Sequence, residues 1–133
     1  MKKQSRRAFL TGTSLLALGA TTSSFASPVA KAPLMHHVFF WLKNPSSRED
    51  FEKLIEGIKT LQKIETPQEF RIGQPAKTPK RGVIDDTYAI SLFTTFSDID
   101  GHNVYQEHPI HKKFIEGYSS LWTKVQVYDS MDI

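Results

Sequence analysis

Hydrophobic and polar positions form two different patterns in the first half of the folded part of the chain: an apolar run and then a helical repeat. Residues 34–43 form a nearly unbroken run of apolar and aromatic side chains that ends at Asn44-Pro45. Because both alternating rows of this run are mostly apolar, it predicts a strand covered on both faces. Residues 46–49, Ser-Ser-Arg-Glu, form a capping-box pattern, and residues 47–64 then carry apolar side chains every three or four positions. This spacing predicts an amphipathic helix.

The second half of the chain repeats the alternation of strand and helix patterns. After Thr66-Pro67, residues 68–76 predict a short twisted strand, and residues 77–86 are rich in proline, glycine and charge, as in a polar loop. The remaining predicted elements are a strand at residues 87–96, a short helix capped at residues 97–100 and ending near 107, a second helix from Pro109 to about 121, and a last strand at residues 122–128.

The predicted order of elements is β-α-β-β-α-β within one domain, residues 34–133. This order is typical of the ferredoxin-like arrangement. The sequence therefore predicts an α+β fold in which a four-stranded antiparallel sheet carries helices on one face.

The N-terminus has the pattern of an export signal. Residues 1–26 contain four basic and no acidic side chains, residues 10–26 are uncharged, and Ser24-Phe25-Ala26 fits a cleavage site. The sequence around Arg6-Arg7, Ser-Arg-Arg-Ala-Phe-Leu, resembles the twin-arginine (Tat) motif of bacterial signals. We therefore expect a Tat-type signal peptide at 1–26, a linker at 27–33, and a periplasmic or secreted protein. The alternative is an uncleaved anchor, for which the segment is weakly hydrophobic.

Charge and cysteine content exclude several kinds of partner and site. Removing residues 1–26 from the 17 basic and 14 acidic residues leaves 13 basic and 14 acidic, so the expected mature chain has no basic footprint for nucleic acid. It also has no stable membrane anchor once the signal is gone. The chain contains no cysteine, which excludes disulfides, a thiolate nucleophile and cysteine metal ligands.

The segment from Tyr105 to His111 gathers three side chains that handle protons around Pro109. Proline suits the first turn of a helix, which places His108 at the N-cap and His111 one turn further on. A helix N-terminus disfavours imidazolium, so a neutral histidine beside a phenol predicts acid/base chemistry. His111 lies on the helix face of Phe114, which we expect to point toward the core or a cavity.

Three features together resemble the stress-responsive α/β-barrel (Dabb) family. They are the opening strand at residues 37–43, the segment Tyr105 to His111 with its His-Pro-x-His sequence, and Trp122 before a last strand. The resemblance implies a ferredoxin-like fold whose sheets pair into a dimeric α/β barrel. It extends distantly to the plant cyclase that makes olivetolic acid without a cofactor, in which a Tyr and a His form the acid/base pair. The resemblance places that pair on Tyr105 and His111, and a pocket histidine on His37.

The resemblance, together with the positions of neighbouring side chains on the first strand and beside Pro109, gives a set of predicted site residues, with no cofactor and no metal. The predicted catalytic residues are Tyr105 and His111, and the predicted substrate contacts are His37, Phe39, Trp41, His108 and Trp122. We expect a homodimer that binds a small organic molecule and performs cofactor-free, cyclase- or lyase-like acid/base chemistry. Because Phe39 and Trp41 share the strand face of His37, they are expected to fill the space that a long alkyl chain would need.

Two alternatives follow from the same residues. One is a non-catalytic dimeric stress or binding protein, and the other is a zinc or copper site built from His37, His108 and His111. Of the remaining histidines, His36 is expected on the opposite strand face, at the dimer sheet, and His102 in solvent.

Overall fold

The computed structural model describes residues 33–133. The predicted signal peptide, its cleavage site and nearly all of the linker lie outside the described residues. Within them, the elements are β1 Leu34–Leu42, α1 Arg48–Thr60, η1 Leu61–Lys63, β2 Glu69–Gly73, β3 Ile90–Phe96, α2 Ile99–Glu107, α3 Pro109–Tyr118, η2 Ser119–Leu121 and β4 Trp122–Met131. No helix of this part of the chain has the length and hydropathy needed to cross a membrane.

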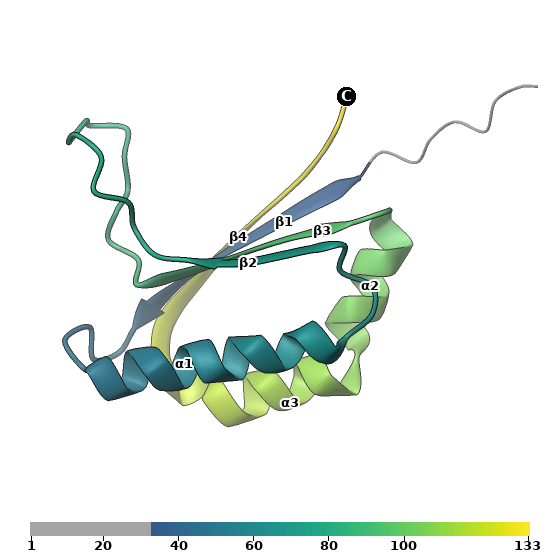
Figure 1. Ribbon diagram of the computed structural model, residues 1–133, viewed down its shortest axis with the longest axis horizontal. Coiled ribbons are helices and arrows are strands. Elements are labelled where there is room, and N and C mark those ends of the chain that lie inside the picture. The colour runs from purple at the N-terminus through teal and green to yellow at the C-terminus, as the bar shows by residue number, and fades with distance from the viewer. Residues whose placement is uncertain (1–32) are drawn as a thin grey trace, which may run out of the picture.

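The four strands form one antiparallel sheet in the order β2-β3-β1-β4. All of the helices lie on one face of this sheet, with α1 and α3 side by side beneath it (Figure 1). The predicted α+β, ferredoxin-like architecture is confirmed. β1 occupies the centre, hydrogen-bonded to β3 on one side and to β4 on the other, so its register is fixed from both edges.

Local capping explains where the helices begin. The Ser47 hydroxyl accepts a hydrogen bond from the Asp50 amide at 3.1 Å, so the cap lies one residue beyond the Ser46 of the predicted capping box. The Asp98 carboxylate accepts one from the Gly101 amide at 2.8 Å and so starts α2. These caps pair amide groups that have no partner within the helix.

Three strand boundaries differ from the prediction by three residues. β2 ends at Gly73 rather than at residue 76. β3 begins at Ile90 rather than at residue 87, because Thr87 turns back to bond the Asp85 carboxylate through both its amide and its hydroxyl. β4 extends to Met131 rather than 128, because β1 is long enough to pair with it as far as Leu34 opposite Met131.

The two faces of β1 have different surroundings. Its even-numbered side chains are all buried against the helices, whereas the odd-numbered ones are half-buried on the face without helices. The buried row is Leu34, His36, Val38, Phe40 and Leu42, and the row on the open face is Met35, His37, Phe39 and Trp41.

The predicted facing of the two histidines on β1 was therefore wrong. His36 lies on the helix side, 4% exposed, and His37 lies on the open face. The physical reason is the polarity of the strand beside them: β4 places Lys124 opposite Trp41 and Val127 opposite Val38. Since cross-strand partners share a face, the apolar row of β4 draws the even row of β1 to the helices.

A glycine allows α1 and α3 to approach closely. A Cβ on Gly57 would lie 2.6 Å from ring carbons of Tyr118 on α3, well inside van der Waals contact. Because these atoms belong to the inner part of the ring, the ring as a whole would have to move. Gly57 is buried, so little free space is available for that movement.

We therefore expect Gly57→Ala to lower the free energy of unfolding by about 1–3 kcal/mol through overpacking. Gly117→Ala is the matched control, because that glycine is also helical and a Cβ added there would meet nothing within 4 Å. It should be neutral or stabilising by up to about 1 kcal/mol, as expected from helix propensity. Urea unfolding of both variants measures the difference, and equal stabilities would contradict the close approach.

Candidate functional site

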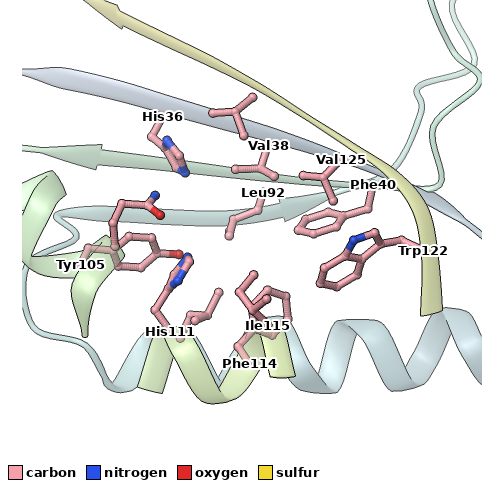
Figure 2. A pocket seen from close by; sticks show the side chains of 13 residues that line it. His36, Val38, Phe40, Leu92, Tyr105, His111, Phe114, Ile115, Trp122 and Val125 are labelled. Carbon is pink, nitrogen blue, oxygen red and sulfur yellow. The ribbon is translucent and has the colours of Figure 1, made fainter. Parts of the chain in front are cut away.

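A cavity of about 150 Å³ lies between the sheet and the helices. Its sheet side is apolar, with Val38, Phe40 and Leu92, and Trp122 lies at one end (Figure 2). The other end is polar and is formed by side chains from three elements: His36 of β1, Tyr105 of α2 and His111 of α3. Gln106 of α2 also lines the cavity. A mostly apolar cavity with a few polar groups at one end is typical of a small-molecule site.

Tyr105 and His111 meet at the polar end of this cavity. Their ring centroids lie 4.9 Å apart with an interplanar angle of 66°, and the Tyr105 hydroxyl is directed toward the imidazole (Figure 2). The sequence prediction that these two side chains come together, with His111 facing a cavity, is confirmed in its geometry.

The break between α2 and α3 produces this meeting. α2 ends at Glu107, and α3 begins at Pro109. Nδ1 of His108 accepts a hydrogen bond from the Ile110 amide at 3.1 Å, so His108 is the N-cap of α3, as predicted. The cap fixes the position of the first turn of α3, which carries His111.

Burial sets the protonation states of the pair. It lowers the pKa of His111, helped by the neighbouring imidazoles of His36 and His102 and opposed by Glu107. It also raises the pKa of the Tyr105 hydroxyl, whose residue is 1% exposed. Near neutral pH the site therefore holds a neutral imidazole, which can accept a proton, and a protonated phenol, which can donate a hydrogen bond.

His36 is the third polar side chain of the cavity, although the strand pattern predicted it at the dimer sheet. Its Nδ1 lies 2.6 Å from Oδ1 of Asp129, its neighbour on β4. In the neutral ring, Nδ1–H donates to this carboxylate and leaves Nε2 as an acceptor. Burial lowers the pKa of His36, while the hydrogen bond to Asp129 and its charge raise it.

His102 is a second histidine whose predicted position, in solvent, was wrong. Its side chain is only 15% exposed and packs against His36, with ring centroids 5.0 Å apart. α2 turns this residue toward the sheet rather than toward solvent. A sequence signal existed: His102 precedes the buried Tyr105 by three positions, so the two share a helix face.

The predicted substrate contacts are not brought together. His108 does not line the cavity, and the other four are divided between the two faces of the sheet. Trp122 lines the cavity with Tyr105 and His111, as expected. His37, Phe39 and Trp41 lie on the open face, away from it, and Phe39 and Trp41 instead border a shallow aromatic hollow.

The predicted metal ligands are likewise not brought together. His37 lies on the opposite face of the sheet from His111. Nδ1 of His108 already accepts the hydrogen bond from the Ile110 amide. Among residues 33–133, the side chains that do converge as metal ligands are His36, His102 and Asp129, whose ligand atoms lie within 4.8 Å of one another.

Comparison with solved structures returns the same fold. A Dabb family protein with a ferredoxin-like fold from Mesorhizobium loti is 21% identical, with a TM-score of 0.63 over 77% of this chain and 98% of that one. A hydroxynitrile lyase from Passiflora edulis is 19% identical, with a TM-score of 0.63 over 77% and 95%. A dimeric ferredoxin-like protein of unknown function from Thermobifida fusca is 16% identical, with a TM-score of 0.60 over 75% and 91%.

At these identities the structural matches establish the fold alone. No curated protein sequence matches the chain significantly. The stress responsive A/B barrel domain model, however, matches residues 34–132, which is nearly the whole of the described part of the chain. The chain therefore belongs to the stress responsive A/B barrel domain (Dabb) family.

Proposed function

We propose that the protein binds a small organic carbonyl compound in the cavity and carries out cofactor-free acid/base chemistry on it, of the cyclase or lyase kind. The observation that supports this is the pairing of Tyr105 and His111 at the polar end of an otherwise apolar cavity. A structural neighbour from Passiflora edulis is a hydroxynitrile lyase, so this fold accommodates a lyase.

In the proposed mechanism, the neutral His111 removes a proton from the carbon next to a carbonyl group. The electron pair of the broken C–H bond moves into the carbonyl, and Tyr105 donates a hydrogen bond to the oxygen on which negative charge develops. The imidazolium then returns the proton to the enolate carbon. Alternatively, the enolate attacks an electrophilic carbonyl carbon, and the imidazolium gives its proton to the alkoxide that forms. Either route restores the neutral base.

The size of the cavity limits the substrate. A volume of about 150 Å³ is close to that of an engineered apolar cavity which holds benzene. Its polar atoms lie at one end, so a molecule with one carbonyl group and a compact apolar body fits best. A linear tetraketide with a long alkyl chain does not fit within the single chain, which argues against olivetolic acid synthesis.

This mechanism predicts exchange of a C–H proton even when the natural substrate is unknown. NMR in D₂O measures deuterium uptake next to the carbonyl of small aryl and alkyl ketones. We expect His111→Asn to slow the enzyme-dependent exchange by at least about 100-fold, the usual contribution of a general base. Tyr105→Phe should slow it by about 10²–10³-fold through loss of a donor to the enolate oxygen.

His108→Asn is the matched control for this exchange. The variant removes a neighbouring imidazole that caps α3 without lining the cavity, and asparagine is itself a good cap. Its exchange rate should equal that of the unmodified protein. Exchange that survives His111→Asn would contradict the role of His111, and the absence of both exchange and ligand-induced thermal stabilisation would contradict the whole proposal.

The open face of the sheet supports a second proposal: two chains pair through this face to form a homodimer. Aromatic rings meet across it: His37 lies 4.2 Å from Phe39, and Phe39 lies 4.8 Å from Tyr88 and 6.0 Å from Tyr128, between ring centroids. Tyr128 is 63% exposed, and no helix of the described chain covers this face (Figure 1). A partly exposed cluster of aromatic rings of this kind favours association.

Tyr128→Asp should therefore convert a dimer into a monomer at micromolar concentration, because pairing would bury the new charge without a partner. Light scattering coupled to size-exclusion chromatography measures the mass. Ile99→Asp, which places the same charge on a 51% exposed apolar residue at the helix side, should leave the mass unchanged. A monomeric unmodified protein, or a Tyr128→Asp dimer of equal strength, would argue against this assembly.

We also propose that the protein is exported through the Tat pathway, on the basis of Arg6-Arg7 and the uncharged stretch after it. Replacing both arginines by lysine keeps the charge and should leave the uncleaved precursor in the cytoplasm. Replacing Lys2 and Lys3 by arginine is the control and should not affect export. Cell fractionation followed by mass spectrometry of the N-terminus distinguishes these results, and normal export of the lysine variant would exclude the twin-arginine signal.

A further inference from the structure

A cluster of three side chains lies beside the cavity, where the helix α2 faces the pair β1 and β4. His36 comes from β1, His102 from α2, and Asp129 from β4, directly opposite His36 in the sheet register. Nδ1 of His36 lies 2.6 Å from Oδ1 of Asp129, and Nε2 of His102 lies 4.0 Å from Oδ2 of the same carboxylate. One carboxylate therefore faces two imidazoles.

The hydrogen bond between His36 and Asp129 accounts for only two of these three side chains. Oδ2 of Asp129 faces His102 at a distance too long for a hydrogen bond. His102 has two other polar contacts: Nδ1 lies 3.3 Å from Oδ1 of Asn103, and Nε2 lies 3.4 Å from Nε2 of Gln106. Both distances are at the weak end of hydrogen bonding. A largely buried imidazole is thus held toward a carboxylate without a short contact to it.

The rings are held in place by packing as well. Phe96 lies against both imidazoles, with centroids 6.2 Å from His36 and 5.4 Å from His102, and Tyr105 lies 6.1 Å from His36. Such packing limits the rotation of the rings. Asp129 is 45% exposed, so the cluster is open to solvent on the β4 side.

We propose that His36, His102 and Asp129 bind one divalent transition-metal ion, represented by Zn²⁺, through His36 Nδ1, His102 Nε2 and the carboxylate. Two imidazole nitrogens and one carboxylate are a ligand set suited to zinc and its neighbours, whereas magnesium and calcium require mostly oxygen ligands. When the ion binds Nδ1 of His36, the ring proton moves from Nδ1 to Nε2, so the imidazole stays neutral and Asp129 binds the ion instead of accepting that proton. Solvent on the β4 side provides its entry path and its fourth ligand.

The cluster must adjust slightly to hold the ion. Bonds of about 2.0–2.1 Å to a tetrahedral ion place the donor atoms about 3.3 Å apart. The separation of 4.0 Å between His102 and Asp129 is therefore somewhat too long, and that of 2.6 Å between His36 and Asp129 somewhat too short. Asp129 is half-exposed and free to rotate between the two rings. The ligand atoms lie within 4.8 Å of one another, so the imidazole rings must also move closer together around the ion.

This site uses neither Tyr105 nor His111 as a ligand, so its test is separate from the test of their proposed chemistry. Tag-free protein is stripped with a chelator and titrated with Zn²⁺ by calorimetry. We expect one ion per chain, and a Zn²⁺-dependent rise in the melting temperature. His102→Leu and Asp129→Asn should each weaken binding by at least about 100-fold, since even loss of a residue that supports a ligand costs roughly 10–100-fold.

His37→Gln is the matched control, because it removes the adjacent histidine on the opposite face of the sheet. It should leave the zinc affinity unchanged, as should Tyr105→Phe. Circular dichroism without metal shows whether each ligand variant is folded. Absence of saturable binding, equal binding by the two ligand variants and the unmodified protein, or equal affinity for Mg²⁺ would each overturn the proposal.

A measurement on the unmodified protein keeps the proposal testable if a ligand variant fails to fold. Co²⁺ loaded in place of Zn²⁺ should give the strong visible absorption of a four-coordinate site, and added Zn²⁺ should displace it. The weak absorption of a six-coordinate ion would contradict the site described above. If the unmodified protein exchanges deuterium but does not bind zinc, the metal site alone is refuted. If it binds zinc but shows no deuterium exchange, the acid/base proposal alone is refuted.

Discussion

The alternation of side chains along the central strand β1 is the constraint on which the rest of the structure depends. Since β1 is hydrogen-bonded to β3 and β4 at once, its register cannot change without breaking both ladders. A shift by one residue would exchange the two faces, placing His37 in the cavity and His36 on the open face. This register therefore decides both the polar end of the cavity and the composition of the aromatic face.

The helical side of the site depends on a second local constraint, the interruption at Pro109. Tyr105 and His111 are six positions apart, and at about 3.6 residues per turn a continuous helix would direct them to well-separated faces. Proline has no amide hydrogen with which to continue α2, so the helix ends there. His108 then caps the start of α3. The change of direction between α2 and α3 is what brings the two rings to 4.9 Å.

Sequence reasoning succeeded where the signal was local. The order of elements and the break at Pro109, with His108 as the cap, follow from short-range patterns, and the family resemblance added the pairing of Tyr105 with His111. The facing of β1 was missed because both of its rows are apolar, and the decisive information is the polarity of β4, far away in the chain. The contact between His36 and Asp129 joins residues 93 positions apart, so it required the register itself.

The position of His36 connects the cavity with the ligand cluster. An imidazole in the buried row of a strand costs free energy unless both of its nitrogens are satisfied. Nδ1 is engaged by Asp129 on the side of β4, and the ring also lines the cavity, so the second nitrogen is left for a group there. Whatever fixes Nδ1, a proton or a metal ion, therefore fixes the ring that a cavity ligand meets. Burying His36 in β1 costs free energy, but it gives the cavity a polar end. Whether the second nitrogen of His36 donates or accepts there depends on what its Nδ1 meets beside Asp129.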